Sequence, residues 1–194
     1  MKQKIITIIG KSGAGKDTVA RMLSYITGYN LICSYTTRPM REGETEGREH
    51  HFVPECHTPR EQMLAYTEYG GYEYWTEKSQ LSETTIYVID EKGLVELSDA
   101  FPDIDLVNIY VSAKPETLKA RGIAPNRTER DAHRVTLDID VFDYVIFNNG
   151  DRFDLFQSVL LMAKAILAKD NVTLSSNRYK GALNELVKLA MAQM

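Results

Sequence analysis

The sequence predicts an α/β fold with a mostly parallel central sheet. Short apolar runs alternate with amphipathic helical patterns, and a glycine-rich loop joins the first run to the first helix. The chain has 194 residues, of which 43% are hydrophobic and 26% are charged. This length and composition fit one globular domain that buries its own core. Consecutive parallel strands are then expected to be joined by right-handed crossovers.

The strands and helices follow from the apolar pattern. Five apolar runs predict buried parallel strands: Ile5–Ile9, Leu31–Tyr35, Ile86–Ile89, Leu106–Val111 and Tyr144–Phe147. Val19, Leu23 and Ile26 are spaced by four and three residues, which predicts a helix after the glycine loop. The same spacing over residues 153–167 predicts a second amphipathic helix.

Three segments depart from the alternation. Residues 36–85 are polar, glycine-bearing and rich in tyrosine, and they predict a small inserted subdomain. Residues 121–130 carry glycine, proline and three arginines, which indicates a loop or lid that we extend to residue 134. Residues 171–194 end in a helical pattern. This C-terminal extension is expected to pack on the chain's own core or to contact a partner.

Composition excludes several functional classes. A net charge of −4 argues against a protein that binds nucleic acid through a broad basic surface. Two cysteines exclude a disulfide framework and fit a reducing compartment. No stretch is apolar and long enough to span a membrane, and no signal peptide is recognisable. We therefore expect a cytoplasmic protein, either a monomer or a homodimer.

The strongest chemical signal is the run from Gly10 to Thr18, Gly-Lys-Ser-Gly-Ala-Gly-Lys-Asp-Thr. It follows an apolar strand and opens a helix, which is the context of a P-loop. Glycines let successive backbone N–H groups turn toward phosphate oxygens, and the helix N-terminus adds partial positive charge there. The predicted phosphate-binding residues are Ser12, Gly13, Ala14, Gly15, Lys16, Asp17 and Thr18.

Two acidic residues are candidate ligands of Mg²⁺. Asp17 stands where a P-loop has Ser or Thr, and a carboxylate beside phosphates is repulsive unless a cation lies between them. The alternative is that Asp17 only caps the helix. Asp90 follows an apolar strand, the place of a Walker-B acid. Asp90 and Gly93 also fit the D-x-x-G of a GTPase, but the partner motif N-K-x-D is absent.

A second phosphate site is indicated by Ser34-Tyr-Thr-Thr-Arg38-Pro39-Met-Arg41. Pro39 favours an extended conformation at Arg38. Two arginines three positions apart on an extended segment can bind phosphate oxygens in pairs. The alternative is a solvated charged loop.

These motifs, with Glu46-Gly-Arg-Glu-His50-His-Phe52 and Phe142-Asp-Tyr-Val-Ile-Phe-Asn148, resemble the guanylate kinase family in order and spacing over residues 4–168. The resemblance implies a three-layer P-loop kinase fold with an inserted subdomain that binds the nucleoside monophosphate and a short lid. It implies transfer of the γ-phosphoryl group of ATP, with Mg²⁺, to a nucleoside monophosphate, usually GMP.

The resemblance also assigns roles by position. Lys16 and Thr18 would hold the ATP phosphates. The residues that would hold the acceptor's phosphate are Arg38, Arg41, Tyr74 and His50, the last replacing a family tyrosine. Ser34 and Asp90 would approach its base. Arg130 and Arg134 look like the lid arginines that bridge donor and acceptor, with Arg121 and Arg127 as further candidates.

Departures from the family pattern leave alternatives open. Ala65 stands where the family has a guanine-reading glutamate, and Glu68 is a neighbouring substitute. Trp75 either narrows the acceptor site or packs in the subdomain. The first function is a kinase of GMP or dGMP. The alternatives are a kinase of ribose bisphosphate or another phosphorylated metabolite, a non-catalytic guanylate-kinase-like binding module, and a GTPase switch.

Overall fold

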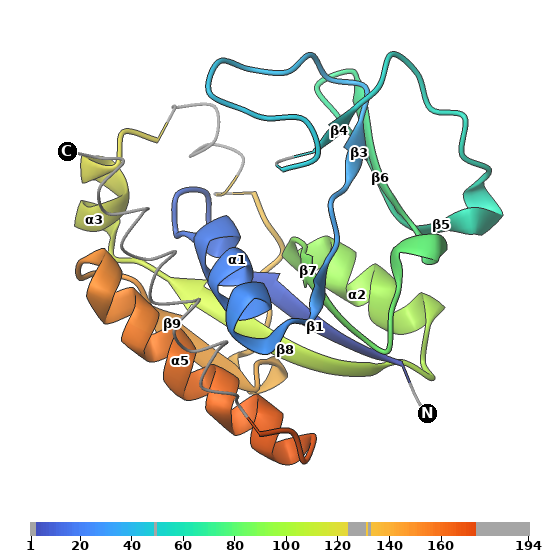
Figure 1. Cartoon of the computed structure of the whole chain (residues 1–194). Coiled ribbons are helices and arrows are strands. Elements are labelled where there is room, and N and C mark those ends of the chain that lie inside the picture. The colour runs from blue at the N-terminus through green and yellow to red at the C-terminus, as the bar shows by residue number, and fades with distance from the viewer. Residues whose placement is uncertain (1–2, 49, 124–130, 132, 174–194) are drawn as a thin grey trace.

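The computed structural model describes residues 3–48, 50–123, 131 and 133–173. Its centre is a five-stranded, all-parallel sheet in the order β2-β7-β1-β8-β9. The strands are β1 (Lys4–Ile9), β2 (Asn30–Leu31), β7 (Thr84–Val88), β8 (Asp105–Ser112) and β9 (Tyr144–Phe147). The predicted α/β fold with a parallel central sheet is confirmed (Figure 1).

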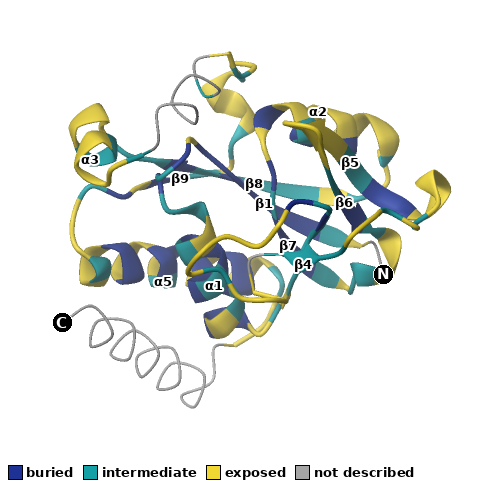
Figure 2. Ribbon diagram, turned by 90° about the horizontal axis from the view of Figure 1, so that it is seen from above, coloured by how far each residue is buried: buried dark blue, intermediate teal, exposed yellow. Residues whose placement is uncertain are grey.

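Helices cover both faces of this sheet. Figure 2 shows α1 (Lys16–Thr27) and α5 (Arg152–Lys169) on one side and α2 (Glu91–Ala100) on the other. Each face of the sheet has its own apolar core, and successive side chains of β1 point alternately into one and the other. Ile6 and Ile8 pack with α1 and α5, whereas Ile5 and Ile9 pack with α2. The short helix α3 (Pro115–Ala120) follows β8.

The ends of the long helices are defined by local hydrogen bonds. Asp151 caps α5 by accepting from the backbone N–H groups of Phe153 and Asp154. Asp90 caps α2 in the same way through the N–H of Gly93. At the other end of α5, Asp170 forms an ion pair with Lys4 and accepts from the Tyr29 hydroxyl at 2.9 Å. The start of β1 and the end of α5 are thereby joined.

A second, four-stranded sheet lies within residues 35–77, in the order β4-β3-β6-β5. Its strands are β3 (Tyr35–Thr36), β4 (His51–Phe52), β5 (Met63–Tyr69) and β6 (Tyr72–Glu77). The described residues also form the short 3₁₀ helices η1 (Arg60–Gln62), η2 (Lys78–Gln80) and η3 (Ile139–Val141).

The predicted strand Leu31–Tyr35 was wrong as a single element. Its first residue ends β2 in the central sheet, and its last residue begins β3 in the second sheet. The chain leaves one sheet for the other between them, so a continuous apolar run encodes two short strands rather than one long strand.

Trp75 lies on one face of the second sheet, where it is buried against its neighbours. It is 3% exposed, stacks on Tyr35 with ring centroids 5.5 Å apart, and donates its indole N–H to Thr58 at 3.0 Å. Its neighbour Tyr74 points to the opposite face, because side chains alternate along a strand. Of the two interpretations of Trp75, packing is therefore the one the structure supports.

Two expectations fall largely outside the described residues. The extension 171–194 is described only up to residue 173, and Arg127 and Arg130 of the predicted lid are not described. Among the described helices, none combines the length and apolar character that crossing a bilayer requires.

Candidate functional site

The loop between β1 and α1 has the backbone geometry of an anion-binding turn. Gly10 and Gly15 adopt φ values of +149° and +100°, which side-chain-bearing residues avoid. A Cβ on Gly10 would collide with the Val111 carbonyl oxygen, and one on Gly15 with the Asn148 amide. No side chain among the described residues caps the N-terminus of α1. This helix end is therefore suited to an anion such as phosphate.

Side chains from other parts of the fold donate hydrogen bonds to the carbonyl oxygens of this loop. Three side chains donate to them: Arg134 Nη1 to Gly10 at 2.9 Å, Arg121 Nη1 to Gly13 at 2.8 Å, and Asn148 Nδ2 to Ala14 at 2.8 Å. A peptide plane whose carbonyl points outward presents its N–H on the other side. The three donors thus stabilise the backbone orientation that phosphate binding needs.

Lys16 begins α1, and its ammonium group donates to the Lys11 carbonyl oxygen at 3.1 Å. Asp17 and Thr18 follow in the first turn of the helix. The cap position is Gly15, so Asp17 does not cap α1 with its side chain.

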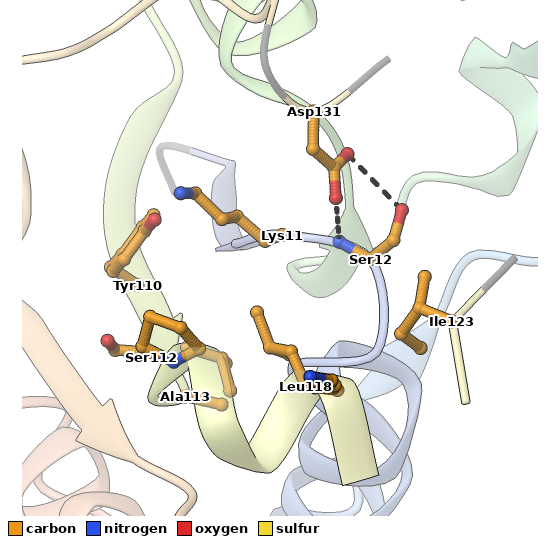
Figure 3. A pocket seen from close by; sticks show the side chains of 11 residues that line it. Lys11, Ser12, Tyr110, Ser112, Ala113, Leu118, Ile123 and Asp131 are labelled. Atoms are coloured by element: carbon orange, nitrogen blue, oxygen red, sulfur yellow. Dashed lines mark hydrogen bonds between the residues drawn. The ribbon is translucent and has the colours of Figure 1, made fainter. Parts of the chain in front are cut away.

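A cavity of about 630 Å³ lies beside the loop, between β8 and α3 (Figure 3). Its walls combine apolar side chains such as Val111 and Leu118 with Lys11, Tyr110 and Asp131. Asp131 accepts from the Ser12 N–H at 2.7 Å and from the Ser12 hydroxyl at 3.2 Å, as the dashed lines in Figure 3 show. The predicted lid segment is therefore in direct contact with the P-loop at this residue.

Four predicted acceptor-site residues lie together on the inner face of the second sheet. Ser34 Oγ and His50 Nδ1 are 2.7 Å apart. The His50 ring meets the Tyr74 ring edge-on at 5.8 Å. The Arg38 guanidinium lies 5.3 Å from the centre of the Phe52 ring. Sequence reasoning thus selected side chains that the fold brings to one place.

Arg38 is held by a carboxylate that sequence reasoning missed. Its side chain is 6% exposed, and Nη1 and Nη2 donate to the two oxygens of Glu44 at 2.8 and 2.9 Å. Burial alone would lower the pKa of Arg38, but hydrogen bonds to Glu44 and Tyr74 outweigh it and raise that pKa. Glu44 also accepts from the Arg41 N–H at 2.8 Å, while the Arg41 residue itself is exposed.

The two candidate metal ligands lie at the starts of different helices, Asp17 in the first turn of α1 and Asp90 as the N-cap of α2. Asp90 accepts from the Gly93 N–H at 2.8 Å, which explains the D-x-x-G spacing as a helix cap. The described residues contain no group of three or more His, Cys, Asp or Glu side chains able to hold a metal. A role of either acid with Mg²⁺ stays a prediction.

The base-reading position carries no carboxylate. Ala65 on β5 packs against the apolar core under α2 and is paired with Thr76. Thr76 donates to the Tyr87 hydroxyl at 3.1 Å, and burial raises the pKa of Tyr87 to about 12. The polar groups beside Ala65 are therefore neutral hydroxyls at physiological pH, and both are buried.

Glu68 does not replace the missing glutamate. It pairs with Glu73 on β6, and the register from Ala65 to Glu68 is regular. Residues three positions apart on a regular strand point to opposite faces. Glu68 is therefore on the outer face with Trp75, away from Ala65 and Tyr74.

Comparisons with known proteins agree with this architecture. The family model described as guanylate kinase matches residues 2–150. A guanylate kinase of Aromatoleum aromaticum is 34% identical over 167 residues, covering 77% of this chain and 82% of the relative. That of Dechloromonas aromatica is 33% identical over 167 residues, covering 77% and 83%. A crystal structure of guanylate kinase from Anaplasma phagocytophilum has a TM-score of 0.59 at 22% identity, covering 86% of each chain, which shows the shared fold.

The Arg38–Glu44 pair predicts an acid-dependent loss of stability. The hydrogen bonds from Arg38 lower the pKa of Glu44 below its ordinary 4.5. A lowered folded-state pKa stabilises the fold above the unfolded pKa, and this stabilisation is lost as pH falls through the folded pKa. Glu44→Gln should cost about 1–2 kcal/mol at pH 7, as expected for hydrogen bonds to a charged group.

Urea unfolding of wild type and Glu44→Gln across pH 3–7 measures this difference. It should shrink toward zero below pH 4.5. Glu42→Gln, an exposed carboxylate of the same loop, is the control and should show no effect. A Glu44→Gln penalty that stays constant down to pH 3 would contradict the assignment.

Proposed function

The chain belongs to the guanylate kinase family, and we propose that it transfers the γ-phosphoryl group of ATP to a nucleoside monophosphate, with GMP or dGMP as the first candidate. The observation that supports this proposal is the presence of two groups of residues suited to phosphate, which differ in construction. One is the backbone turn after β1, and the other is the buried Arg38 cluster that follows β2. In a parallel sheet, the loops after these strands share one edge.

On the donor side, the P-loop backbone and Lys16 hold the ATP phosphates, with Ser12 to Thr18 forming the cradle. The glycine conformations and the uncapped α1 N-terminus fit a bound triphosphate. Mg²⁺, when bound, offsets charge between the β- and γ-phosphates. Asp17 would hold the metal, directly or through water, and Asp90 is the second candidate.

On the acceptor side, Arg38 is the principal phosphate ligand. Glu44 keeps the guanidinium buried and oriented before substrate arrives, which avoids part of the entropic cost of ordering it. His50 and Tyr74 add hydrogen-bond donors on the same face, and Arg41 adds an exposed charge. Ser34 and Asp90 are the proposed contacts to the acceptor's base.

The transferred group is negatively charged, so the reaction depends on positioning and on positive charge. Lys16, Arg38, Arg130 and Arg134 are the proposed catalytic residues. The segment predicted as 36–85 is the proposed acceptor-binding subdomain, although its last two residues lie in β7 of the central sheet. Residues 121–134 are the proposed lid, whose closure would exclude water and suppress hydrolysis of ATP. A cytoplasmic location and a monomer or homodimer stay predictions.

A second candidate function is favoured by one observation. Ala65 packs on an apolar core, and the groups beside it are neutral hydroxyls. A site without the carboxylate that pairs with guanine N–H groups discriminates poorly for guanine. A phosphorylated sugar such as ribose 1,5-bisphosphate needs no such carboxylate. A non-catalytic binding module is the third candidate.

A panel of acceptors tests the proposed function. Purified protein with Mg-ATP is supplied with GMP, dGMP, AMP, CMP, UMP, dTMP or ribose 1,5-bisphosphate, and ADP formation is compared with a sample without acceptor. We expect saturable turnover of GMP or dGMP, reduced at least 100-fold in Lys16→Ala. Turnover of only the sugar bisphosphate would favour the second candidate. ATP binding without any turnover would favour the binding module.

Arg38→Ala should raise the KM for the acceptor roughly tenfold or more, because a bidentate phosphate ligand is lost. The dissociation constant of ATP should be unchanged. Arg60→Ala is the control, since Arg60 is exposed and lies over Tyr66 on the outer face of the same sheet. The assignment fails if Arg38→Ala weakens ATP binding and leaves the acceptor KM intact.

Asp17→Asn should raise the Mg²⁺ concentration required for half-maximal turnover by roughly tenfold, because a neutral amide is a weaker ligand of a hard cation. Thermal unfolding without Mg²⁺ should change little, since Asp17 does not cap α1. Turnover titrated with Mg²⁺ in both proteins measures the effect. An unchanged Mg²⁺ requirement would remove Asp17 as a metal ligand.

A further inference from the structure

Glu91 is a buried acid whose position was not singled out by any motif. It is the first residue of α2, directly after the cap Asp90, and its side chain is 8% exposed. A carboxylate removed from water is unfavourable unless an opposite charge or hydrogen-bond donors compensate it. The buried carboxylate of Glu91 therefore requires a positively charged or hydrogen-bonding partner.

That partner is Arg134, 43 positions later in the chain. Arg134 Nη1 donates to Glu91 Oε2 at 3.2 Å and to the Gly10 carbonyl oxygen at 2.9 Å. Arg134 Nε lies 3.0 Å from Asp131 Oδ1. Asp131 in turn accepts from Ser12 (Figure 3). The guanidinium is thus held between α2 and the entrance of the P-loop.

These contacts use Nη1 and leave other donors of the guanidinium available. Nη1 donates to Glu91 and to Gly10, Nε forms an ion pair with Asp131 but no hydrogen bond, and Nη2 has no hydrogen-bond partner among the described residues. The Arg134 side chain is 14% exposed. Two N–H donors beside an anion-binding loop are the chemistry that a phosphate oxygen requires.

We propose that Glu91 is a positioning residue that acts through Arg134, fixing this guanidinium at the mouth of the P-loop so that it contacts a phosphate group of the bound nucleotide. The inference rests on the proposed function for the identity of that nucleotide as ATP. Without Glu91, Arg134 loses its link to α2 and samples many rotamers, and each must be reordered when phosphate binds.

If the negative charge of Glu91 acted directly on the bound phosphates, removing it would change the affinity for ATP in the opposite direction. If Glu91 acted only as a negative charge near the phosphates, its removal would strengthen ATP binding, whether by Glu91→Ala or by Glu91→Gln. If it acts by holding Arg134, Glu91→Ala weakens ATP binding, and Glu91→Gln largely restores it, because the amide oxygen can still accept from Nη1.

The test is a double-mutant cycle with Glu91→Ala, Arg134→Ala and the double variant. It is measured on the dissociation constant of Mg-ATP by calorimetry and on kcat with the best acceptor. We expect each single variant to lose roughly tenfold in both quantities, a size typical of groups that orient a ligand-binding residue. The double variant should be no worse than Arg134→Ala, because Glu91 acts only through that side chain.

Glu91→Gln should lie within about threefold of wild type, as rescue by the conservative variant. Glu96→Ala is the matched control, an exposed acid on the same helix that pairs with Lys92, and should leave both quantities unchanged. Circular dichroism and urea unfolding confirm that each variant is folded. If Glu91→Ala unfolds, a cycle of Glu91→Leu with Arg134→Ala replaces it, because leucine keeps the side-chain volume but cannot accept from Nη1, and it is judged by the same non-additivity.

Strictly additive losses, or tighter ATP binding in both Glu91 variants, would overturn the proposal. The two proposals fail separately. If wild type turns over no acceptor, the proposed function has failed, and the calorimetric cycle still decides the role of Glu91.

Discussion

The orientation of the peptide planes in the P-loop is the constraint on which the rest of the site depends. Glycine makes the turn possible, but it does not by itself select one arrangement, because glycine loses more backbone freedom on folding than any other residue. The arrangement is selected by donors to the loop's carbonyl oxygens from Arg121, Asn148 and Arg134. These donors come from the end of α3, the end of β9 and the segment before η3. Because β8 lies between β1 and β9, the sheet order itself brings these residues to the loop.

The group around Arg38, the proposed acceptor phosphate site, is also held in one orientation by hydrogen bonds, but through side chains instead of backbone. Arg38 could not be buried as an unpaired cation, and Glu44 supplies two oxygens in the geometry that a guanidinium fits. Glu44 is itself fixed by the Arg41 N–H within a tight loop. Both proposed phosphate sites are therefore ordered without a ligand, one by oriented peptide dipoles and one by an oriented ion pair.

Sequence reasoning succeeded where the signal is local. The P-loop, the parallel strands and the long helix α5 each depend on patterns within about 20 residues, and the fold confirms the predicted class. It failed where the answer depends on which face a strand presents. The exchange of sheets between Leu31 and Tyr35, and the outward direction of Glu68, follow from register that an unpaired strand does not reveal. Glu91 was missed because its partner Arg134 is 43 positions away, although a buried acid at a helix start is a usable signal in retrospect. Glu44 was missed although Arg38 is only six positions away, because the sequence does not show that the loop between them turns back.

The contacts of Asp170 with Lys4 and Tyr29 bear on where further segments can be attached to the protein. Lys4 begins β1 and Asp170 follows α5, so both ends of the described core meet at the edge of the sheet opposite the phosphate loop. An appendage joined at either end begins far from the reacting groups. The contacts of Asp170 with Lys4 and Tyr29 are then what such an appendage must leave intact, because they join the two ends of the described core.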